Sequence, residues 1–192
     1  MSCCGRCRTG SRGTGRPSGT GQREEVGLAE NQVLTYLQMI SLDELRPAPV
    51  PAVPIEIIEQ DRHSPLIRST TLRIGRAHSW PSQSWSEEQW QAYLNRPYLR
   101  HWVAVLDGGP VGLLSLDVPP GGDVEIDTFG LLPDHVGRGL GGHFLTLSAQ
   151  LAWDVAPPGS RVWLHTSDRD HPAALPNYQR RGFQQYQVGP GP

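Results

Sequence analysis

The sequence predicts an α/β protein in which a mixed, mostly antiparallel central sheet is flanked by helices, after a disordered N-terminal tail. Two observations support this fold class. Short apolar segments of strand length alternate with segments whose apolar residues repeat at helical spacing. Proline- and glycine-rich turns separate the two kinds of segment. With 192 residues and no internal repeat, the chain predicts one modest domain over residues 28–192.

Residues 1–27 are predicted to form the disordered tail, because they are rich in Gly, Ser, Thr and Arg and contain almost nothing to bury. All three cysteines, Cys3, Cys4 and Cys7, lie there without a nearby histidine. Structural zinc usually takes four ligands, so we predict no metal site. The five arginines of the tail allow a second interpretation, a basic arm that contacts RNA or acidic surfaces, although a solvated tail is the simpler one.

The composition excludes several functional classes. A hydrophobic content of 37% with a net charge of −2 is typical of a soluble globular protein and argues against a nucleic-acid or membrane partner. No apolar run approaches the length of a membrane span, and no apolar segment follows the first arginines as in a secretory signal. We therefore expect a cytoplasmic protein.

Strands are predicted first for four segments: 33–40, 55–58, 101–106 and 111–116. Prolines between residues 47 and 54 require an extended crossing between the first two segments. The last two flank Asp107-Gly108-Gly109, which is a hairpin signal.

Two helices are predicted between the second strand and the hairpin. The first covers 65–76, because Leu66, Thr70 and Ile74 are spaced along one face. The second runs to about residue 95 from a capping box formed by Ser86 and Gln89.

The most informative segment is 124–142, VEIDTFGLLPDHVGRGLGG. A strand-like run breaks at Pro133 into a glycine-rich turn, and apolar residues at helical spacing follow from Leu140 to Leu151. Glycines let the backbone approach a ligand closely, and the N-terminus of the following helix favours an anion. The segment therefore predicts a pyrophosphate site.

Residues 137–142 also satisfy the dinucleotide fingerprint G-x-G-x-x-G. That fingerprint should follow its strand directly, and an acidic residue should end the next strand about twenty positions later. Here residues 133–136 separate the strand from the glycines, and the next predicted strand, 161–166, has His165 near its end. The sequence thus disfavours a nicotinamide or flavin cofactor.

The same segment resembles motif A of the GNAT acetyltransferase superfamily, in which a strand is followed by [Arg/Gln]-x-x-Gly-x-[Gly/Ala] and a helix. The resemblance implies that the turn's amides hold the pyrophosphate of acetyl-CoA and that the preceding strand runs alongside its pantetheine arm. Val136 departs from the family's Arg or Gln, and Arg138 supplies charge nearby. The implied coenzyme-binding residues are Leu131, Leu132, Val136, Gly137, Arg138, Gly139, Leu140, Gly141 and Gly142.

Residues 168–183, DRDHPAALPNYQRRGF, resemble motif B of that family, where a short helix ends in Tyr-x-x-x-Gly-Phe before a last strand. Gly182 suits a left-handed C-terminal cap. Pro176 does not suit a helix that begins at Pro172, so we expect the regular helix nearer to 176–181. Two motifs in this order indicate a GNAT-like domain, with the resemblance covering 33–188.

The resemblance implies an acetyl-CoA-dependent N-acetyltransferase that moves an acetyl group to a primary amine. Because no cysteine lies outside the tail, we expect direct attack in a ternary complex. Glu125 resembles the family's general base, with Asp127 as a reserve base or an anchor for a cationic substrate. The alternative is that both are the solvated face of a half-exposed strand.

Tyr178 resembles the tyrosine that protonates the departing thiolate, and the alternative is packing beside Phe183. Two interpretations are open for tryptophans 80, 85 and 90. They line the acceptor pocket, or they are packing residues of a lid and of the core. A possible metal cluster is formed by His165, Asp168, Asp170 and His171. A turn-capping role for Asp168 or His171 is the simpler interpretation.

The expected partner is a small-molecule or protein amine, and a homodimer is compatible with the sequence. A different functional class stays open, a non-catalytic acyl-CoA-binding or regulatory module with the same fold. Val136 favours that second class, whereas Glu125 and Tyr178 favour the enzyme.

Overall fold

A computed structural model describes residues 32–190. Its strands are β1 (Val33–Met39), β2 (Glu56–Gln60), β3 (Leu99–Leu106), β4 (Gly109–Asp117), β5 (Val124–Leu131), β6 (Val162–Ser167) and β7 (Gln184–Pro190). Its α-helices are α1 (Pro65–Gly75), α2 (Glu87–Leu94), α3 (Leu140–Val155) and α4 (Ala174–Arg180). This arrangement confirms the predicted α/β class and the predicted order of elements.

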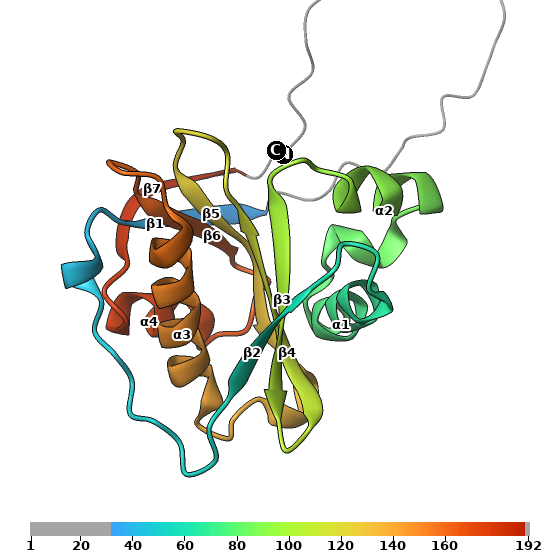
Figure 1. Ribbon diagram of the computed structural model, residues 1–192, viewed down its shortest axis with the longest axis horizontal. Coiled ribbons are helices and arrows are strands. Elements are labelled where there is room, and N and C mark those ends of the chain that lie inside the picture. The colour runs from blue at the N-terminus through green and yellow to red at the C-terminus, as the bar shows by residue number, and fades with distance from the viewer. Residues whose placement is uncertain (1–31, 191–192) are drawn as a thin grey trace, which may run out of the picture.

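The strands form a seven-stranded sheet in the order β2-β3-β4-β5-β6-β1-β7. Within the described residues all neighbours are antiparallel except β5 and β6. Helices α1 and α2 lie on one side of the sheet and α3 and α4 on the other, as Figure 1 shows. Each pair buries its own apolar cluster, the first around Trp90 and the second around Phe144.

Strands β5 and β6 share only a short parallel ladder. The paired residues are Val124 with Val162 and Glu125 with Trp163, although β5 continues to Leu131 and β6 to Ser167. On its other side β5 contains a bulge, because Thr128 pairs with Ser115 while Ile126 pairs with the next residue of β4. Asp127 is the extra residue of that bulge. The two strands therefore part immediately after Glu125.

The local turn signals are confirmed. Asp107 and Gly108 both have positive φ angles, 51° and 75°, as expected for the two-residue turn that joins β3 to β4. The capping box of α2 is complete, since Ser86 and Gln89 bond each other's backbone amides at 3.3 and 2.8 Å.

Helix α4 begins two residues earlier than predicted, at Ala174 instead of Pro176. Pro176 occupies the third helical position, where a backbone N–H would have no partner within the helix. The missing donor therefore costs no helical hydrogen bond. Gly182 ends this helix with a φ angle of +104°, as the sequence predicted.

Gly182 also lies against the segment that follows β1. A β-carbon at this position would come within 2.0 Å of the carbonyl oxygen of Glu44. The neighbouring Arg181 carbonyl accepts a hydrogen bond from the amide of Arg46 at 3.0 Å. The cap of α4 is thus packed directly on the backbone near the start of the fold.

The tail predicted over residues 1–27, with its cysteines, lies outside the described residues, so the boundary at residue 28 stays a prediction. Between residues 32 and 190, no helix is both long and apolar enough to cross a membrane.

We predict that Gly182→Ala destabilises the protein by at least about 3 kcal/mol, because it adds a backbone clash to an unfavourable φ angle. Gly159→Ala is the matched control, since Gly159 also has a positive φ, of 82°, but has open space around its missing β-carbon. The control should lose about 1 kcal/mol. Urea unfolding of both variants measures the difference, and equal losses would show that the contact with Glu44 is unimportant.

Candidate active site

The glycine-rich turn presents unpaired backbone amides. Gly137 and Gly139 both have φ angles of +79°, and neither faces any atom within 4 Å of its missing β-carbon. Gly139 caps α3 without a side-chain hydrogen bond, so the first amides of this 16-residue helix have no helical acceptor. No hydrogen bond among residues 32–190 uses the amides of 137–139. The turn therefore carries several free donors at the positive end of a helix, which is the geometry of an anion site.

Helix α4 packs closely on the first turn of α3. The side-chain amide of Asn177 donates to the carbonyl of Gly141 at 3.2 Å. A β-carbon on Gly142 would lie 2.9 Å from the guanidinium of Arg181. Gly142 thus permits a close approach that brings a cation to the start of α3. Asn177 and Arg181 were not singled out from the sequence, because their partners are distant in the chain.

The other predicted coenzyme-binding residues differ in accessibility. Arg138 is exposed, and 40% of Val136 is exposed. Leu131 is half-buried at the end of β5. Leu132 is buried in the α1 side of the core, and its amide donates to the carbonyl of Val111 at 2.8 Å. The amide of Leu132 is therefore already used by the fold.

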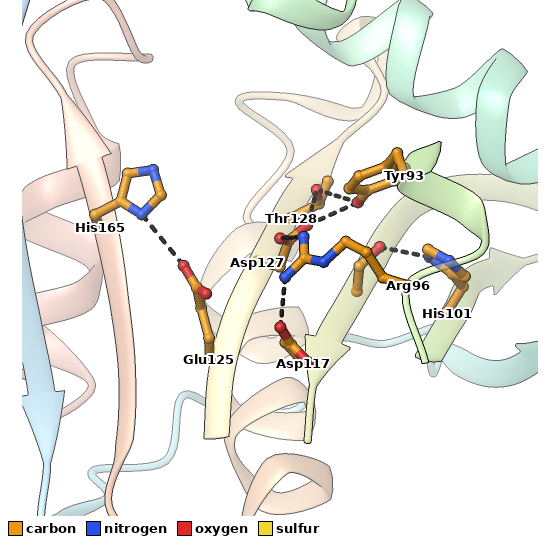
Figure 2. A network of polar contacts seen from close by, with 9 residues as sticks. Tyr93, Arg96, His101, Asp117, Glu125, Asp127, Thr128 and His165 are labelled. Carbon is orange, nitrogen blue, oxygen red and sulfur yellow. Dashed lines mark hydrogen bonds and ion pairs between the residues drawn. The ribbon is translucent and has the colours of Figure 1, made fainter. Parts of the chain in front are cut away.

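Glu125 lies at the point where β5 and β6 part. Its side chain is 13% exposed, and its Oε1 is 3.5 Å from Nδ1 of His165 on β6. Figure 2 shows this pair spanning the two strands. The interpretation of Glu125 as part of a solvated strand face is therefore wrong.

Asp127 is held by a polar network on the α2 side of the sheet. Its side chain is 14% exposed, and Arg96 contacts Oδ1 at 2.6 Å. The Tyr93 hydroxyl donates to Oδ2 at 2.7 Å, and the hydroxyl of Thr128 donates to the same oxygen at 3.1 Å. Arg96 also pairs with Asp117, so one guanidinium joins two carboxylates (Figure 2). Asp127 is therefore not on a solvated strand face either.

The network fixes the protonation of its members. Burial, strengthened by the charge of Asp127, raises the pKa of Tyr93 well above its usual value, so the phenol stays a donor. Burial alone would lower the pKa of Arg96, but Asp127 and Asp117 raise it above its usual value. The bulge of β5 is consequently held by Tyr93 of α2 and by a permanent cation, Arg96, just after that helix. Sequence reasoning missed Tyr93 and Arg96, which lie more than thirty residues before Asp127.

His101 lies next to this network in the buried face of β3. Its Nδ1 is 2.8 Å from the hydroxyl of Ser115, and its ring centroid is 6.0 Å from that of Tyr93. Burial lowers the pKa of His101 from 6.5 to about 4. The imidazole is therefore neutral at physiological pH.

Tyr178 combines a packed ring with an unpaired hydroxyl. Its ring centroid is 6.1 Å from that of Phe129 on β5 and 6.3 Å from that of Phe183. Burial, followed by the charge of Asp170, raises the pKa of Tyr178. Its hydroxyl makes no hydrogen bond to any residue that the structure describes. The side chain is thus a core residue that keeps its proton and has one donor to spare.

The tryptophans before the hairpin are packing residues. Trp90 is buried in the α1 and α2 core, and Trp80 and Trp85 pack against the same cluster. The indole N–H of Trp80 donates to Asp170 at 3.0 Å, which ties this region to the loop after β6.

The polar residues after β6 act as turn caps. Asp170 accepts from the amide of Ser167 at 2.8 Å, and Nδ1 of His171 accepts from the amide of Ala173 at 3.1 Å. Among residues 32–190, no three His, Cys, Asp or Glu side chains are grouped so that they could hold a metal ion. That the protein needs no metal stays a prediction.

Comparison with known proteins agrees with this geometry. The model of the acetyltransferase (GNAT) family matches residues 67–183. The comparison with curated proteins gave no match. Similar solved structures include GCN5-related N-acetyltransferases from Kribbella flavida (18% identity, TM-score 0.56, 83% of this chain and 56% of that chain) and Sphaerobacter thermophilus (19%, 0.57, 82% and 50%). A tandem GNAT protein from the clavulanic acid biosynthesis pathway is also similar (20%, 0.57, 85% and 55%).

The fold is that of an acyltransferase domain with a divided central sheet and a glycine turn before its main helix. The chain belongs to the GNAT acetyltransferase family. It spans about half the length of the three solved structures named above, and at these identities they support the fold alone.

We predict that His101 makes the protein sensitive to acid. Because its pKa is lowered in the folded state, the unfolded chain binds the extra proton, and stability falls as pH drops below 6.5 toward 4. Between pH 7 and pH 5 this group should account for a loss of about 2 kcal/mol. His101→Asn keeps a donor facing Ser115 and should reduce the pH slope of the unfolding free energy. An unchanged slope would contradict the assignment.

Proposed function

We propose that this protein is an acetyl-CoA-dependent N-acetyltransferase that moves an acetyl group to a primary amine by direct attack in a ternary complex. One observation carries the proposal: β5 and β6 part at Glu125, and a turn of free amides follows the opposite end of β5. The unpaired edge of β5 runs from the half-buried carboxylate of Glu125 toward the segment that leads into this turn. An extended thioester with a pyrophosphate at its far end matches that arrangement.

The residues fit the donor in two places. The amides of 137–142 and the start of α3 suit a pyrophosphate, with Arg138 and Arg181 nearby. Beyond Glu125, the edge of β5 that faces β6 has no ladder partner among the described residues. It can pair with an extended chain as a strand edge does, which suits the pantetheine arm. Leu131 and Leu132 would then lie at the end of that edge, where Leu132 is anchored by its packing in the core on the α1 side.

Glu125 is the proposed general base. Acetyl-CoA, when bound, supplies the acetyl thioester, and a neutral amine is needed to attack it. The half-buried carboxylate of Glu125 faces the opening and takes the amine proton. Asp127 is less suited to this role, because Arg96 holds one of its oxygens and Tyr93 and Thr128 hold the other. Tyr178 is the proposed general acid, whose free hydroxyl donates to the departing sulfur.

A second function, a non-catalytic acyl-CoA-binding or regulatory module, is favoured by Val136. This exposed apolar residue stands where the family usually has a polar one. Both functions require acetyl-CoA to raise the melting temperature, because a ligand of the native state stabilises it. Thiol release from acetyl-CoA across a panel of primary amines separates them. Stabilisation without release with any amine would favour the second function.

The cytoplasmic location, the lack of nucleic-acid and membrane partners, and a homodimer stay predictions. The identity of the amine, small molecule or protein, is likewise part of the proposal.

We predict that Gly139→Asp weakens acetyl-CoA binding roughly tenfold relative to Gly139→Asn, because two like charges about 10 Å apart near a surface repel by about 1.5 kcal/mol. Asn and Asp both tolerate the positive φ angle of this position, so the pair differs only in charge. Calorimetric titration of both variants with acetyl-CoA measures the effect. Equal affinities would argue against a pyrophosphate at this turn.

We predict that Tyr178→Phe lowers kcat about a hundredfold, because it removes the proposed proton donor to the thiolate. Its unfolding free energy should change by less than about 0.5 kcal/mol, since the hydroxyl has no partner in the described part of the chain. Thiol release and urea unfolding are measured on the same preparation. Full activity in this variant would support a packing role alone.

A further inference from the structure

Resting on the proposed function, we propose that His165 receives the proton that Glu125 takes from the acceptor amine and passes it to solvent. It would act through Glu125 and would not contact the substrate itself. In the sequence alone, His165 suggests only a possible metal ligand.

The register of the sheet brings the two side chains together. Trp163 on β6 is the last residue paired with β5, and its partner is Glu125. His165 lies two residues farther along β6 and so points to the same face as Trp163. Its Nδ1 is 3.5 Å from Oε1 of Glu125, across the opening between the strands (Figure 2). Such catalytic contacts often tighten only when substrate is bound.

The imidazole connects a buried atom with solvent. Nδ1 is buried and has no hydrogen-bond partner in the described part of the chain, so the carboxylate of Glu125 is its nearest ionic neighbour. The side chain as a whole is 32% exposed, against 13% for Glu125. Nε2 makes no hydrogen bond to any residue between 32 and 190, and it is not among the buried unpaired atoms. One ring nitrogen thus faces the base while the other reaches water.

The neighbouring rings hold the imidazole in this orientation. Tyr36 stands directly opposite His165 in the register of β1 and β6, with ring centroids 5.8 Å apart. The Trp163 ring lies 6.5 Å from the imidazole and 6.4 Å from the Tyr36 ring, so the three rings form one cluster. The titratable groups next to His165 on the packed strands are Glu125 and Tyr36, and Tyr186 of β7 packs against Tyr36 with ring centroids 6.2 Å apart. Within residues 32–190, His165 has no ion pair other than that with Glu125.

The proton balance is simple. The ammonium of the acceptor gives a proton to the Glu125 carboxylate, which frees the nitrogen lone pair for attack. The resulting Glu125 O–H passes its proton to Nδ1 of His165, and the imidazolium loses the Nε2 proton to water. Glu125 returns to its ionised form without waiting for the product to leave, and no oxidant or reductant is needed.

The experiment compares three variants by thiol release at saturating acetyl-CoA. His165→Ala removes the ring, and His165→Asn keeps an N–H facing Glu125 but cannot carry a proton. Both should lose about tenfold to hundredfold in kcat while keeping the KM for acetyl-CoA. Added imidazole should restore His165→Ala and leave His165→Asn low. His63→Asn, which changes an exposed histidine after β2, is the matched control and should keep full activity.

Two outcomes overturn the proposal. Full kcat in His165→Asn would mean that the histidine only holds Glu125 in place, and no response of His165→Ala to imidazole would mean that it carries no proton. A wild-type protein that releases no thiol with any amine would instead contradict the proposed function, and the relay with it.

A measurement on the wild-type fold is independent of turnover. The ring-nitrogen resonances of His165 are compared by NMR in the wild type and in Glu125→Gln. Because Oε1 of Glu125 lies 3.5 Å from Nδ1, loss of the carboxylate should shift the Nδ1 resonance more than that of Nε2. Unchanged resonances would show that the two groups do not interact and would overturn the proposal even if a His165 variant fails to fold.

Discussion

The early parting of β5 and β6 is the constraint on which the rest of this structure depends. Two parallel strands that pair only through Val124 and Glu125 leave backbone groups without partners in the middle of a sheet. Such groups are costly unless a ligand or water satisfies them. The fold must therefore hold the two strands apart against their tendency to pair. The elements around β5 keep them in this position. On the β4 side, the bulge at Asp127 turns the strand, and Arg96, just after α2, holds that bulge through a partly buried ion pair.

The other side of the opening is held by the two ends of the described chain. Strand β1 lies between β6 and β7, so the first strand of the chain joins the last strand to the rest of the sheet. The close contact of Gly182 with Glu44 joins the same two regions. The residues matched by the family model begin at 67 and so leave β1 out, although β1 supports the strand that carries His165. The site thus depends on residues beyond the matched segment.

The parts predicted from sequence are those set by local chemistry. The Asp107-Gly108 turn, the capping box of Ser86 and Gln89, and the left-handed Gly182 each need only a few neighbouring residues, and each is confirmed. The start of α4 differs from the prediction because Pro176 lies in the first turn of the helix, where proline is tolerated, and not in its interior. The ion pair of Arg96 with Asp127 and the pairing of Glu125 with His165 join residues 31 and 40 positions apart. No spacing rule within the sequence connects them, since they meet only through the sheet register.

Val136 has a physical consequence for how the donor is held. With an exposed valine where the family usually has Arg or Gln, affinity for a pyrophosphate must come mainly from backbone amides and the α3 dipole. Backbone donors act only when their φ and ψ angles are right, so the proposed site depends on the positive φ angles of Gly137 and Gly139. Arg181, at the end of α4, is brought to the start of α3 by the glycine at 142 and adds a cation to that of Arg138. The packing of α4 on α3 therefore links the position of Tyr178 to the strength of the anion site, because one short helix carries both.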